Sequence, residues 1–220
     1  MVRRAVLEPL SKVVDLLKAH QVDEHKLCAQ LIEVSNDWNT LDHYFGSLSA
    51  DELKNLRSVV MPERSNRARE VLSRMTVHAQ NGDLAMEKAL TVLGRVSKSL
   101  DSACDDRAEK IMGKETLRCM NTALDNEDRS DVCTRLRQLS VGASKVLAFF
   151  GDVPFFTAVG LKNYVEDAMY LLRDHQNNPV GPLNLHSLSK LDDGMRKNLG
   201  AAAVVLCNFG LEMEPELRIC

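Results

Sequence analysis

Apolar residues recur at intervals of three and four along most of this chain, and this spacing constrains the fold more than any other feature. Two early runs follow it: Val6, Leu10, Val13 and Leu17, then Leu27, Leu31, Val34 and Trp38. Residues three or four apart share one face of an α-helix, so each run predicts an amphipathic helix. No stretch alternates strictly between apolar and polar residues in the manner of a β-strand. The chain is therefore predicted to be all-α.

Capping residues, glycines and prolines divide the chain into about nine predicted helices. Ser49 and Glu52 have the spacing of a capping box, which marks a helix start, while Pro62 and Gly151 mark helix ends. The predicted helices span residues 3–20, 23–44, 49–61, 63–80, 83–103, 105–124, 131–150, 153–175 and 187–209. The last of them contains a run that is apolar on all sides, which is typical of a buried helix.

The length of the chain and the absence of a linker favour one domain over residues 1–220. A domain of this size buries about 70% of its unfolded surface in a single core. The helices are similar in length, which suits stacked antiparallel pairs, but no repeated signature accompanies them. We therefore expect a single-domain multi-helix bundle, with an α-solenoid-like stack of helical hairpins as the alternative.

Charge and cysteine usage limit the partners and the compartment. With 28 basic and 31 acidic residues, the chain has a net charge of −3 and no global field that would attract nucleic acid. The longest apolar run is far shorter than the roughly 20 residues that span a bilayer, so no transmembrane segment is expected. The six cysteines are dispersed in apolar helical patterns. Reduced thiols, and hence the cytoplasm or the nucleus, are the simplest interpretation.

No spacing of reactive residues predicts catalysis or a metal centre. His25 and Cys28 share a helix face, but no second pair completes the four ligands of a structural zinc site. The acidic segment 125–131 resembles a calcium loop only in charge, because Ser130 and Leu136 occupy the positions that require glycine and glutamate. We expect neither an enzyme nor a bound cofactor or metal.

Arginines gather on one side of the predicted helix 63–80. Arg64, Arg67 and Arg74 fall within one broad stripe of that helix. Guanidinium groups bind carboxylates and phosphates through paired hydrogen bonds. The stripe is either a solvated face paired with neighbouring acids or a binding surface for an acidic protein partner or a phosphate-bearing ligand.

Four of the six phenylalanines lie within eight residues, around the turn 151–154. They are Phe149, Phe150, Phe155 and Phe156. Adjacent residues on a helix are about 100° apart, so both members of a pair cannot point into one core. This hydrophobic corner either joins two helices to the bundle or leaves a ring exposed for a partner.

These patterns lead, mainly by elimination, to a non-catalytic helical protein–protein interaction module, an adaptor or regulator. Its expected contact surfaces are the hydrophobic corner and the arginine-rich helix face. The alternative is a helical carrier that encloses an apolar ligand or lipid, which the Leu-, Val- and Met-rich composition permits. The oligomeric state is left open by the sequence.

Overall fold

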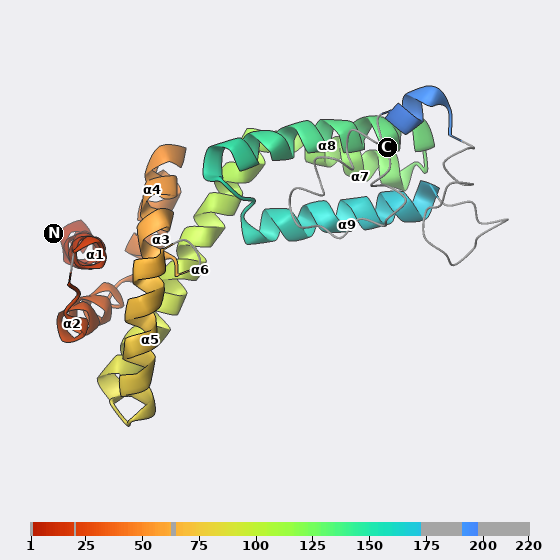
Figure 1. Ribbon diagram of the computed structural model, residues 1–220. Helices are drawn as coiled ribbons and strands as arrows, with labels where there is room; N and C mark the ends of the chain where they lie inside the picture. The colour runs from red at the N-terminus through yellow and green to blue at the C-terminus, as the bar shows by residue number, and fades with distance from the viewer. Residues whose placement is uncertain (1, 20, 63–64, 173–190, 198–220) are drawn as a thin grey trace. The chain divides into compact units, whose positions relative to one another are not determined.

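The computed structural model describes residues 2–19, 21–62, 65–172 and 191–197, which form nine long α-helices and no strand (Figure 1). The helices are α1 (Val2–Lys18), α2 (Glu24–Val34), α3 (Trp38–Ser47), α4 (Ala50–Val60), α5 (Asn66–Gln80), α6 (Leu84–Met112), α7 (Lys114–Asp125), α8 (Arg129–Phe150) and α9 (Phe155–Leu172). The prediction of an all-α multi-helix bundle is confirmed. Among the described residues, no helix has both the length and the apolar character needed to cross a membrane.

The chain divides into two compact units, residues 1–104 and residues 105–220, and the boundary falls inside α6. We call them unit 1 and unit 2. Two compact units can belong to one domain, so a single domain over residues 1–220 stays a prediction.

Unit 1 is organised around α1, which contacts α2, α3, α4 and α5. Its core is mainly aliphatic, with Val13, Leu31 and Leu41 fully buried beside the ring of Phe45. A buried ion pair adds to this core: Arg57 Nη2 of α4 lies 3.1 Å from Asp101 Oδ1 of α6, and Arg57 is 6% exposed. A buried charge is tolerated only when it is paired, so this contact fixes α4 against α6.

Unit 2 contains three long helices, α7, α8 and α9, that contact one another. Figure 1 shows α8 and α9 running side by side in opposite directions. Gly142 of α8 faces the end of α6, where a methyl group added to this glycine would come 3.3 Å from Met112 Cα. Glycine therefore permits the close approach of α8 to α6 at this point.

The predicted helix 23–44 is wrong in one respect, because the chain breaks it into α2 and α3. Asp37 has a non-helical backbone (φ −150°), and its Oδ1 accepts a hydrogen bond from Thr40 N at 3.0 Å. Its Oδ2 accepts a second from Thr40 Oγ1 at 2.6 Å. Asp37 is thus the N-cap of α3, and the cap overrides the apolar spacing that continues through Trp38.

The predicted break between residues 103 and 105 is also wrong, because α6 continues to Met112. The pair Asp105-Asp106 suits a helix start by sequence, but both residues lie inside α6. The break comes instead at Gly113, whose φ of 91° is in the region that favours glycine. Pro9 lies within α1, which runs through it.

Most of the predicted helix 187–209 lies outside the described residues. Cys207 and Cys220 lie outside them too, and no disulfide joins the four described cysteines.

Candidate functional site

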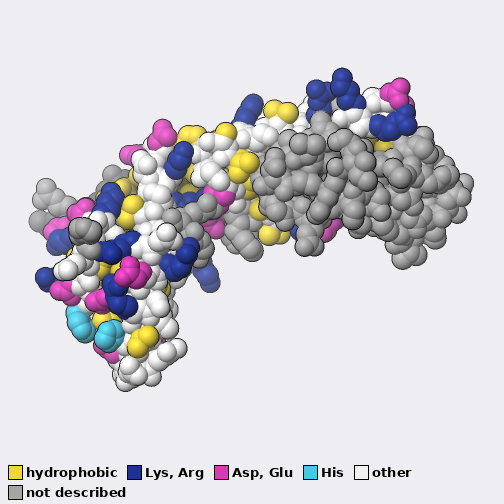
Figure 2. All heavy atoms as spheres, viewed as in Figure 1, with side chains coloured by type: hydrophobic (Ala, Val, Ile, Leu, Met, Phe, Trp, Pro, Cys, Tyr) yellow, Lys and Arg dark blue, Asp and Glu magenta, His cyan; other side chains and the backbone are white. Residues whose placement is uncertain are grey.

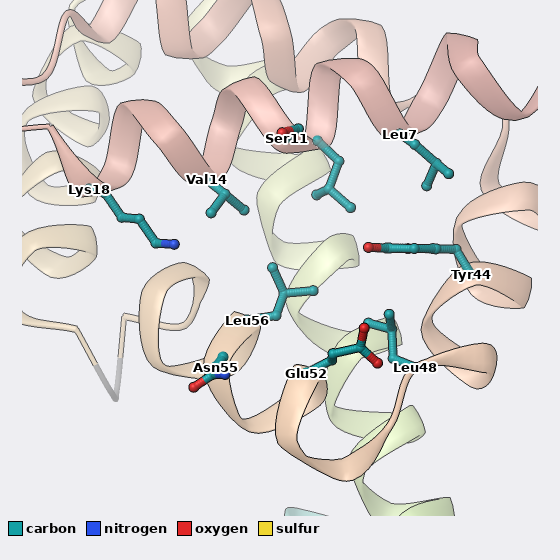
Figure 3. A pocket seen from close by; sticks show the side chains of 10 residues that line it. Leu7, Ser11, Val14, Lys18, Tyr44, Leu48, Glu52, Asn55 and Leu56 are labelled. Carbon is teal, nitrogen blue, oxygen red and sulfur yellow. The ribbon is translucent and has the colours of Figure 1, made fainter.

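Unit 1 has an open groove between α1 and α4, closed at one end by α3 (Figure 3). Its volume is about 280 Å³. Ten residues line it: Leu7, Leu10, Ser11, Val14, Lys18, Tyr44, Leu48, Glu52, Asn55 and Leu56. We call this the α1–α4 groove. Six of these residues are aliphatic or aromatic, so the groove presents a mainly apolar floor to solvent.

The groove exists because the apolar stripe of α1 is wider than the part of the stripe that its neighbouring helices cover. Val13 and Leu17 are fully or almost fully buried, whereas Leu7 and Val14 on the same helix are only half-buried. Figure 3 shows Leu7 and Val14 pointing from α1 toward the space that Leu56 enters from α4. A helix with an apolar arc broader than its contact surface leaves part of the arc for another element.

Tyr44 is the aromatic residue of this site. Its ring projects from α3, and its hydroxyl points into the space between α1 and α4 (Figure 3). A second hollow, of about 270 Å³, lies on the other side of Leu7 and Tyr44 and is also lined by Thr40, His43 and Ser47. Tyr44 therefore forms a wall shared by two hollows. An amphipathic ring in such a position is well suited to anchor a partner.

The rim of the groove is polar, with a cation on α1 and an anion on α4. Lys18 is exposed at the end of α1. Glu52 is held by the capping box of α4, in which its Oε2 accepts hydrogen bonds from Ser49 Oγ at 2.6 Å and Ser49 N at 2.8 Å. These bonds, that from the Ser49 side chain first, lower the pKa of Glu52, so the rim keeps its negative charge.

The predicted arginine stripe is engaged within unit 1. Arg64 lies outside the described residues. Arg67 donates from Nη2 to the carbonyl of Ala19 at 3.0 Å, and Arg74 pairs through Nε with Glu24 and through Nη1 with Glu70, the latter at 2.6 Å. Figure 2 shows basic and acidic side chains interspersed over this face of unit 1. Binding of a partner by these arginines stays a prediction, and the guanidinium groups of Arg67 and Arg74 already have acceptors.

The predicted hydrophobic corner is described only in part. Phe150 is buried and 7% exposed, Phe149 is half-buried, and the two rings meet edge to face with centroids 5.0 Å apart. This asymmetry between neighbours is what helix geometry requires. The side chains of Phe155 and Phe156 lie outside the described residues, so a partner-binding role for the corner stays a prediction.

The α1–α4 groove was not predicted from the sequence. The sequence signal for it is the excess of apolar residues on the first helix, where Leu7 and Val14 lie at the edges of the main stripe. That signal identifies a wide apolar face, but it does not tell which part of the face another helix covers.

His25 of α2 and His78 of α5 lie close together at the surface, with ring centroids 5.9 Å apart. Within the described part of the chain, no group of three or more His, Cys, Asp or Glu residues is arranged to hold a metal ion. Comparisons with protein-family models, curated proteins and solved structures found no match for this chain.

Proposed function

We propose that this chain is a non-catalytic helical interaction module that binds an amphipathic helix of a protein partner in the α1–α4 groove. The observation that carries the proposal is the groove itself, an apolar floor with a polar rim along two exposed helices. Grooves of this kind bind helices through apolar residues spaced three, four and seven apart.

The dimensions of the groove support a helix as its occupant. Leu7 and Lys18 lie near its two ends on α1 and are eleven residues apart. At a rise of about 1.5 Å per residue, this separation is about 16 Å, or three helical turns. A partner helix of that length would place two or three apolar side chains on the floor, and an acidic side chain opposite Lys18 would complement the charge at the end of α1.

The same measurements favour a docked helix over an enclosed lipid or other apolar ligand. Ligand pockets commonly hold about 300–1,000 Å³ and enclose most of the ligand surface. The α1–α4 groove holds about 280 Å³ and is open to solvent along its length. Such a shape suits a few side chains of a larger partner better than a whole carried molecule.

The test uses the full chain and a phage-displayed library of helix-forming peptides about 14 residues long, a length set by the groove. We expect selected peptides to carry apolar residues at helical spacing. Binding should weaken at least 30-fold in Val14→Glu and Tyr44→Ala, which corresponds to about 2 kcal/mol at an interface anchor. Val77→Glu is the matched control, because Val77 is 54% exposed on α5 and does not line the groove.

Two outcomes contradict the proposal. One is a selection that yields no helical pattern, or peptides whose affinity is the same for Val14→Glu and Val77→Glu. The other is a purified chain that retains an apolar small molecule, detected by native mass spectrometry, which Val14→Glu releases. The second result would replace the interaction module with the carrier.

A further inference from the structure

A second groove, on unit 2, differs from the first in its charge. It lies where α7 and α8 meet the end of α6, and its volume is about 370 Å³. Its floor includes Met112 and Gly142, and its walls include Thr134, Arg137, Val141 and Lys145. We call it the α7–α8 groove. Among the described residues that line it, none is acidic and two are basic.

The groove follows from the local sequence. Gly113 ends α6 with a φ of 91°, and Gly142 lets α8 approach Met112 closely. Because adjacent residues on a helix point about 100° apart, the close approach at Gly142 turns the neighbouring Val141 outward. Val141 is 51% exposed, which is unusual for a valine within a long helix of a core.

The exposed valine lies midway between the two cations. Arg137, Val141 and Lys145 follow one another at intervals of four residues on α8. Each interval advances about 6 Å along the helix, so a positive charge lies one turn to either side of the apolar side chain. A complementary ligand presents one aliphatic side chain with a carboxylate about 6 Å to each side.

We propose that the α7–α8 groove is a docking site for an acidic segment of a protein partner, in which an aliphatic residue lies between carboxylates one helical turn away. Its apolar centre favours a peptide over a nucleic acid, because a sugar–phosphate backbone has no aliphatic side chain to cover the exposed Val141. The site is separate from the α1–α4 groove and does not depend on it.

The experiment titrates the isotope-labelled full chain with a defined peptide and follows backbone amide shifts by NMR. The probe has a central leucine, with two glutamates centred one turn before it and two centred one turn after it, in an alanine and glutamine background. We expect a Kd below about 1 mM and shifts confined to the amides around Met112–Thr116 and Thr134–Lys145. The same peptide with glutamine in place of glutamate should bind at least about tenfold more weakly.

Variants assign the binding to the groove. Lys145→Glu and Arg137→Glu should each weaken the peptide about tenfold, and Val141→Gln should weaken it at unchanged charge. Lys88→Glu, an exposed position of α6 in unit 1, makes the same change in net charge and should leave the Kd unaltered. Absence of binding, shifts outside the groove, or equal weakening by Lys88→Glu would overturn the proposal. Tighter binding of a single-stranded oligonucleotide of equal charge, with loss in Lys145→Glu, would overturn it in favour of a polyanion site.

Discussion

Asp105 and Thr157 are 52 residues apart in sequence and are joined by two hydrogen bonds to one oxygen. Asp105 Oδ1 accepts from the backbone N–H of Thr157 at 2.7 Å and from its Oγ1 hydroxyl at 2.7 Å. Thr157 is the third residue of α9, where backbone N–H groups have no partner within the helix. Asp105 of α6 is therefore a long-range cap for α9, and its charge complements the positive end of that helix.

Replacing Asp105 with alanine should destabilise the protein by about 1–3 kcal/mol, because two donors near the start of α9 would lose a buried acceptor. Thr157→Val keeps the backbone bond and should cost about 1 kcal/mol. The control is Asp106→Ala, since Asp106 is exposed, and its effect should lie within about 0.5 kcal/mol. Denaturant unfolding of the three variants measures these differences. Equal losses in Asp105→Ala and Asp106→Ala would refute the capping role.

Two glycines within helices of unit 2 should respond differently to replacement by alanine. At Gly160 of α9 an added Cβ meets nothing within 4 Å, so Gly160→Ala should raise the free energy of unfolding by about 0.5–1 kcal/mol. At Gly142 the added Cβ would lie 3.3 Å from Met112 Cα, so the same helix-propensity gain should be cancelled or exceeded by crowding. A comparable gain at both positions, measured by denaturant unfolding, would show that α8 does not need glycine to approach α6.

Cys133 should make stability decrease at alkaline pH. Burial in α8, and then the negative charge of Asp192, raise the pKa of its thiol from 9.0 to about 11. Above a pH of 9.0 the thiol ionises in the unfolded chain while it stays neutral in the folded one. This contribution to stability is complete below that pH and is lost as the pH rises to about 11. Chemical unfolding across this window should show a smaller decrease for Cys133→Ala than for the natural chain, and equal decreases would contradict the assignment.

The predicted helices were most accurate where a cap or breaker acts within a few residues. The Ser49–Glu52 capping box begins α4, and Gly151, with a φ of 81°, ends α8. The wrong break between residues 103 and 105 arose because a residue there acts over a long distance. Asp105 caps a helix 52 residues away, so it resembles a local helix start when only its neighbours are known.

The candidate sites follow the same rule. Features set by neighbouring residues could be predicted from the sequence, and features set by distant helices could not. Helix geometry predicted that Phe149 and Phe150 would differ in burial, and they do. The arginine stripe was also found from local spacing, but the partner of Arg74 on α2, Glu24, is 50 residues away. Both grooves depend on which apolar residues a distant helix leaves uncovered, as Val14 and Val141 show, and no local pattern contains that information.

Reversing the charge of Arg74 should lower the stability of unit 1 whether or not Arg74 binds a partner. Its guanidinium lies between Glu24 and Glu70, so Arg74→Glu would bring three carboxylates together. The loss of stability should become smaller as salt is added, because these side chains are partly exposed and salt screens their charges. Arg74→Gln should cost less, since it removes the attraction without adding repulsion.

Two comparisons isolate this ion pair. Arg69→Glu changes the same charge at an exposed neighbouring position of α5 and should cost less stability than Arg74→Glu. Hydrogen bonds from the backbone N–H of Glu24 and then from the Arg74 side chain hold the pKa of Glu24 below its usual value of 4.5. The contribution of the ionised Glu24 to stability is therefore complete above a pH of about 4.5 and is lost in more acid solution. Thermal unfolding at low and high salt, repeated from neutral pH to well below this pKa, measures both effects. If Arg74→Glu and Arg69→Glu melt alike at low salt, the Glu24–Arg74 pair contributes nothing to stability, and the arginine would be left as a binding residue.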